Sequence, residues 1–129
     1  MVDGKVANKK AEERTLDRIV SDTQLVSCSV VSKTGLHVAG DSSNPQKKET
    51  FAAMAAIVFS AAEALKSDVK DGRVTNIVVS FKNSRIVFVP INSNYILVGI
   101  TREPNVDEKA LRSMDEGASR LRREAPWLN

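Results

Sequence analysis

PQKKETFAAMAAIVFSAAEALKSD, residues 45–68, is the stretch that decides the fold. Plotted at about 100° per residue, its apolar side chains fall into neighbouring stripes that cover well over half of a helix. A surface helix normally buries only about a third of its circumference. The segment therefore predicts a helix from about Pro45 to Asp68 with two partners, a sheet of its own chain and one further surface. The two main stripes are Phe51, Met54, Val58, Ala61 and Leu65, and Ala52, Ala55, Phe59 and Ala62.

The surplus apolar surface of this helix predicts contact with a second copy of the chain. With 129 residues and only three predicted helices, the chain has little left to cover a second face. The alanine side chains also let another backbone approach closely. The alternative is a helix that simply lies at the centre of a monomer.

One helix and a hairpin are predicted before the central helix. The range Asn8 to Asp22 has apolar residues at helical spacing, and Gln24 to Ser32 is rich in strand-favouring types. Lys33-Thr34-Gly35 is typical of a tight turn, so a second strand from Leu36 to Gly40 is expected to pair with the first.

Three strands and a last helix are predicted after the central helix. The strands Val74 to Lys82, Arg85 to Ile91 and Tyr95 to Thr101 have short connections, which force antiparallel neighbours. Their apolar runs are nearly continuous, as is typical of a sheet covered on both faces. The pattern from Asn105 to Glu108 resembles a capping box and starts a helix that ends near Ala125.

The predicted fold is of the α+β class, with the order α-β-β-α-β-β-β-α. A five-stranded antiparallel sheet with helices on both faces accounts for the burial pattern. The length fits one domain. We expect residues 9–129 to form it and residues 1–8 to be a flexible N-terminus.

Residue types that usually carry chemistry are scarce. His37 is the only histidine and Cys28 the only cysteine, which leaves no internal disulfide and too few ligands for a zinc site. The sequence contains neither the phosphate-binding loop nor the dinucleotide-binding fingerprint. We therefore expect no catalytic residue, no metal, no cofactor and no small-molecule substrate.

The charge pattern and hydropathy exclude other classes of partner. The net charge is +3 with both signs interspersed, whereas nucleic-acid binders usually show a denser basic patch. The cluster Arg120, Arg122 and Arg123 is interpreted as a solvated helix end or as a surface for an acidic partner. Trp127 packs back on the core or anchors a partner. Without an apolar run of about 18–20 residues or a signal-like N-terminus, we expect no membrane span and a cytoplasmic location.

Several segments together resemble the roadblock (dynein light-chain-like) family. They are the turn and strand Gly35–Gly40, the alanine-rich start Phe51–Ala56, the ending Phe88–Ile91 and the strand Tyr95–Ile100. The resemblance covers roughly residues 16–122 and implies a fold of the profilin-like or longin-like type.

Roadblock domains typically dimerise by packing the alanine-rich helix and the following strand against their mates, which gives one continuous sheet. The resemblance implies a homodimer that binds a Ras-like small GTPase, as an activator, exchange scaffold or adaptor. Such a dimer would stimulate hydrolysis by ordering the catalytic groups of the GTPase itself. The positions expected at the dimer contact are Ala52, Ala55, Ala56, Phe59, Ala62, Ile77, Val79 and Phe81.

Two other functions stay open from the sequence. A small-molecule-sensing domain can use the same architecture, but it needs a cavity lined by larger side chains. The alanine-filled helix and only six aromatic residues (one Trp, one Tyr and four Phe) favour close packing instead. A structural adaptor subunit of a larger assembly, without direct GTPase contact, differs from the regulator only by its partner.

Overall fold

The elements of the fold follow the predicted order. The computed structural model describes residues 11–22, 25–40, 47–70, 72–102 and 108–124. The residues 1–8 expected to be flexible, the cap at Asn105 and Trp127 lie outside this part of the chain. The elements are α2 (Ala11–Asp22), β1 (Leu25–Ser32), β2 (His37–Gly40), α3 (Lys48–Ala64), the 3-10 helix η2 (Leu65–Asp68), β3 (Ile77–Ser80), β4 (Arg85–Pro90), β5 (Tyr95–Thr101) and α4 (Glu108–Glu124).

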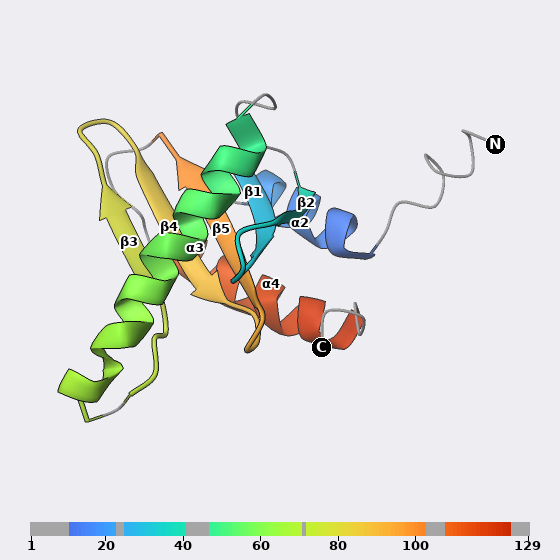
Figure 1. Cartoon of the computed structure of the whole chain (residues 1–129). Helices are drawn as coiled ribbons and strands as arrows, with labels where there is room; N and C mark the ends of the chain where they lie inside the picture. The colour runs from blue at the N-terminus through green and yellow to red at the C-terminus, as the bar shows by residue number, and fades with distance from the viewer. Residues whose placement is uncertain (1–10, 23–24, 41–46, 71, 103–107, 125–129) are drawn as a thin grey trace.

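The five strands form one antiparallel sheet in the order β2-β1-β5-β4-β3. The strand that comes last in the sequence, β5, lies at the centre, where Val98 pairs with Ser29 of β1 and with Phe88 of β4. Because β5 separates the two hairpins, β2 and β3 lie at opposite edges of the sheet (Figure 1).

Helices cover both faces of the sheet, as predicted. Along β5, Ile96 and Val98 belong to the cluster under α3, whereas Leu97 between them belongs to the cluster under α2 and α4. This alternation is the period of two expected for a strand buried on both sides. Figure 1 shows α3 crossing one face, with α2 and α4 on the opposite face.

A glycine sets the packing of α2 on α4. A Cβ on Gly117 would lie 2.4 Å from Cδ1 of Ile19, so a larger residue there would force the Ile19 side chain to shift. On the same side of α4, Met114 and Leu121 are fully buried against the sheet. The close approach of α2 and α4 closes this face of the core.

The edge strand β2 is held by a contact from α2. The backbone N–H of Gly40 donates to a carboxylate oxygen of Glu13 at 3.0 Å. Gly40 has φ +95°, and a Cβ there would lie 2.3 Å from the carbonyl oxygen of Cys28. Only glycine fits this position, and Glu13 satisfies a backbone donor that the sheet edge would otherwise leave open.

The strand predicted from Val74 to Lys82 is shorter in the structure, where β3 spans only Ile77–Ser80. Ile77 pairs with Phe88, so residues before Ile77 would have to pair with the end of β4. That end is Pro90, which has no backbone N–H to donate. The ladder between β3 and β4 ends at the pair of Ile77 and Phe88, two residues before Pro90.

Candidate functional site

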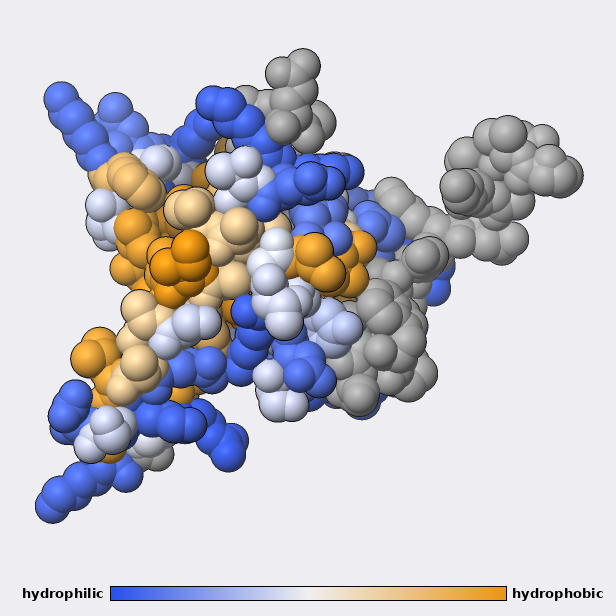
Figure 2. All heavy atoms as spheres, in the orientation of Figure 1, coloured by the Kyte–Doolittle hydropathy of each residue, from blue (hydrophilic) through white to orange (hydrophobic). Residues whose placement is uncertain are grey.

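The side of α3 that faces away from the sheet is apolar. Met54, Ile57 and Leu65 at the start of η2 expose 55%, 59% and 61% of their surface. We call these three residues the outer stripe: Met54 and Ile57 are three residues apart, and Leu65 follows eight residues later on the same side. Figure 2 shows apolar side chains along the face that α3 and β3 present, with hydrophilic ones at the lower end of the helix.

The eight residues expected at a contact between copies divide into three groups. Phe81 is exposed, and Ala62, Ile77 and Val79 are half-buried. The remaining four are buried within their own chain, where each is at most 6% exposed. The exposed apolar surface of α3 therefore lies beside them, on the outer stripe. The four buried residues are Ala52, Ala55, Ala56 and Phe59.

Small side chains explain which side of α3 faces inward. Alanines bring the helix axis close to the sheet, and the ring of Phe59 fills the core between them. The β1–β2 turn also lies against α3, because a Cβ on Gly35 would come within 3.4 Å of the Cα of Ala53. The buried cluster consists of Val31, Ala52, Ala55, Phe59, Phe88, Ile96 and Val98.

The strand β3 extends the apolar surface to the edge of the sheet. Among the described residues it pairs with β4 on one side only, and none of the described strands lies beside its other edge. Ile77 and Val79 face the cluster under α3, and Phe81 just beyond the strand is 53% exposed. A bare edge next to exposed large apolar residues is typical of a protein–protein contact.

By length and composition alone, the helix Lys48–Asp68 could also cross a membrane. Within the chain, however, one side of it packs on the sheet through Ala52, Ala55 and Phe59. Only 22% of its most apolar window is buried by the rest of the chain. One side of the helix therefore packs in the core, and its opposite side is exposed in the single chain.

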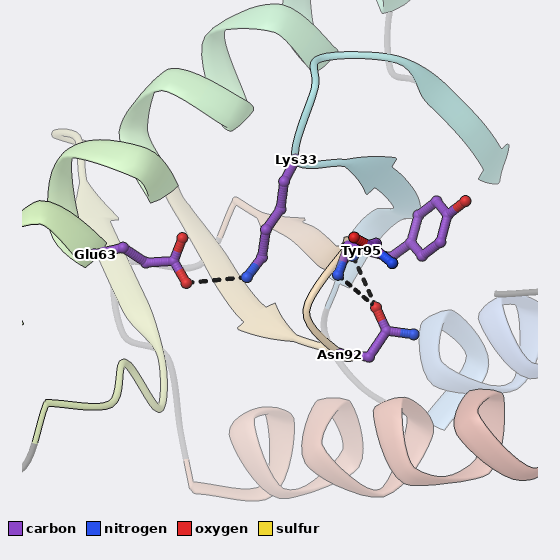
Figure 3. A network of polar contacts seen from close by, with 5 residues as sticks. Lys33, Glu63, Asn92 and Tyr95 are labelled. Carbon is purple, nitrogen blue, oxygen red and sulfur yellow. Dashed lines mark hydrogen bonds and ion pairs between the residues drawn. The ribbon is translucent and has the colours of Figure 1, made fainter. Parts of the chain in front are cut away.

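An ion pair ties the end of α3 to the β1–β2 turn. Nζ of Lys33 lies 2.9 Å from a carboxylate oxygen of Glu63 (Figure 3). The same Nζ lies 5.0 Å from the centroid of the Phe59 ring. The backbone N–H of Lys33 donates to the carbonyl of Asn94 at 2.8 Å, and Oδ1 of Asn92 accepts from the N–H groups of Asn94 and Tyr95. Two turns are thus locked to α3. The sequence carries no signal for this ion pair, because its members are 30 residues apart.

Groups that could carry chemistry are few in the described part of the chain. There, no three His, Cys, Asp or Glu side chains come together in a way that could hold a metal ion. Cys28 is buried, and burial raises the pKa of its thiol to about 12, so it is not a nucleophile at neutral pH. What this surface offers is apolar area and backbone hydrogen bonds.

Comparisons with known proteins agree with this fold. The sequence matches the model of the Roadblock/LC7 domain over residues 11–101, whereas no curated protein matches it. The Roadblock/LC7 domain from Streptomyces avermitilis is similar with a TM-score of 0.78 and 19% identity, over 90% of this chain and 96% of that one. MglB, solved with a tetrameric arrangement, gives 0.81 and 17% over 92% and 93%. Profilin II of Acanthamoeba castellanii gives 0.58 and 16% over 89% and 99%.

At these identities the solved structures establish the fold, which is of the roadblock and profilin-like type. The family match goes further, because it runs from the start of α2 to the end of β5, through the whole sheet and the helix with the outer stripe. The chain belongs to the Roadblock/LC7 domain family.

Proposed function

We propose that the chain forms a homodimer through α3 and β3, and that this dimer regulates a Ras-like small GTPase without supplying a catalytic group. The observation that carries the proposal is the outer stripe of α3 beside the bare edge of β3. One symmetric contact would cover both features, since a two-fold axis brings the same patch of each copy together.

The energetics favour such a contact. Fully burying a large aliphatic side chain stabilises by about 1.5–3 kcal/mol, and each copy exposes Met54, Ile57 and Leu65. Because these side chains are 55–61% exposed, covering six of them contributes about 5–10 kcal/mol. This lies within the range of about 4–15 kcal/mol that the loss of rotational and translational freedom costs. Antiparallel pairing of two β3 edges would add backbone hydrogen bonds and give one continuous sheet.

Two comparisons support the proposal. MglB, a protein of the same fold, assembles with a tetrameric arrangement. The roadblock family associates with Ras-like GTPases, and the resemblance of this chain implies the same kind of partner. Because the surface offers apolar contact and no catalytic side chain, we propose that the dimer acts by ordering the catalytic groups of the GTPase.

The test is a pull-down from native lysate with the purified chain, with either GDP or a GTP analogue added, followed by turnover measurements on the captured GTPase. We expect a Ras-like GTPase to be retained, and its rate of GTP hydrolysis to change by at least tenfold. The variant Ile57→Glu should lose both effects. Val26→Glu, which changes an exposed apolar residue of β1, is the matched control. If no GTPase is captured, or if its turnover stays the same, the regulatory role is wrong.

A further inference from the structure

A basic cleft lies at the end of α3, on the side of Glu63. It has a volume of about 500 Å3 and is formed by the β1–β2 turn, the end of α3, residues 72–74, the β4–β5 turn and α4. Four cations line it, and Glu63 is the only carboxylate among the lining residues that the structure describes. The net charge of this wall is therefore strongly positive. The four cations are Lys33, Lys66, Arg73 and Arg122.

Two of these cations are held in place by their own chain. Lys33 is fixed by its ion pair with Glu63 (Figure 3), and its Nζ lies over the ring of Phe59. The guanidinium of Arg122 donates to the carbonyl of Ile91 and, at 2.9 Å, to the hydroxyl of Ser119. Cations that are already positioned lose little side-chain entropy when an anion binds.

The other two cations stand open to solvent. Lys66 and Arg73 are exposed, and no carboxylate in the described part of the chain pairs with either of them. Apolar side chains lie between the cations, where Val74 and Pro90 are half-buried and the lining residues Phe59 and Ile91 are each only 1% exposed. The cleft therefore combines cations with a small accessible apolar area at Val74 and Pro90.

We propose that this cleft binds an acidic segment of a partner protein, with carboxylates on both sides of an apolar side chain. The carboxylates would meet Lys66, Arg73 and Arg122, and the apolar side chain would lie against Val74 and Pro90. A volume of about 500 Å3 suits a few residues of such a segment. The inference stands apart from the proposed function, because it requires neither the homodimer nor a GTPase.

A fluorescein-labelled hexapeptide, Glu-Asp-Phe-Glu-Asp-Leu, is the probe, and its amide counterpart Gln-Asn-Phe-Gln-Asn-Leu is the control ligand. Fluorescence polarisation measures binding to the full chain in 50 mM and in 300 mM NaCl. We expect the acidic peptide to bind in the micromolar range, at least tenfold more tightly than its counterpart, and to weaken at high salt. In NMR spectra of the labelled chain, the amide signals of Gly72, Val74 and Ser93 should shift on titration.

The variant Lys66→Glu/Arg73→Glu should weaken binding of the acidic peptide at least tenfold. Both changes fall on exposed side chains, so the NMR spectrum should remain that of the folded protein. Arg112→Glu reverses an exposed cation of α4 outside the cleft and should bind as the unmodified chain does. Equal weakening by Arg112→Glu would show non-specific attraction and overturn the proposal. So would equal binding of both peptides, or displacement of the acidic peptide by inorganic phosphate at micromolar concentration.

Discussion

At Gly40 the backbone of β2 passes closer to β1 than any side chain would permit. A Cβ there would meet the Cys28 carbonyl oxygen and Cα of Ser29, at 2.3 and 2.7 Å, and neither backbone atom can move aside. With φ +95° the backbone is also unfavourable for any L side chain. We expect Gly40→Ala to lower the free energy of unfolding by about 2–4 kcal/mol, measured by urea denaturation.

Gly72 provides the control for this prediction. It has φ +67°, but a Cβ there would meet nothing within 4 Å. Gly72→Ala should therefore cost only the backbone strain, about 1 kcal/mol. Equal losses at Gly40 and Gly72 would mean that the close approach of β1 and β2 adds nothing to the cost.

The two sides of α3 show where prediction from sequence ends. The pattern of residues 45–68 is sufficient to predict a helix that packs on the sheet. The pattern does not show which apolar stripe meets the sheet. A helix that is apolar over more than half its circumference can be rotated about its axis without burying its polar side chains. In the structure the small side chains Ala52 and Ala55 pack on the sheet, and the larger Met54 and Ile57 face away from it.

The ion pair between Lys33 and Glu63 should stabilise the seating of α3 on the β1–β2 turn. The two side chains are 20% and 38% exposed, so solvent screens the pair only in part. In a double-mutant cycle with Lys33→Met and Glu63→Gln, we expect a coupling free energy of about 0.5–1 kcal/mol from urea denaturation. The coupling should shrink in 1 M NaCl. A coupling of zero at low salt would contradict a role for this pair in joining the two elements.

For the whole molecule, the local patterns predict the order of the elements but not every contact that holds them. The sheet places β5 beside β1, and the cleft at the end of α3 joins residues from Lys33 to Arg122. Each of these features arises only when segments far apart in the sequence meet. The basic cluster of the last helix contains both kinds of contact. Arg120 pairs with Glu124 within the helix, whereas Arg122 donates to the carbonyl of Ile91 in the β4–β5 turn.

A test of self-association must change a side chain that is exposed in the single chain. A charge at Phe59 would be buried in the core of each single chain, so loss of a dimer in such a variant would report unfolding. Ile57 is exposed in the single chain, so Ile57→Glu should leave the fold intact and remove apolar area only from the contact between copies. By light scattering we expect twice 14.1 kDa for the unmodified chain and for Val26→Glu, and 14.1 kDa for Ile57→Glu with an unchanged circular dichroism spectrum. An unmodified chain that stays at 14.1 kDa up to about 100 μM, well above the micromolar range of specific contacts, would show that the outer stripe is not covered by a second copy.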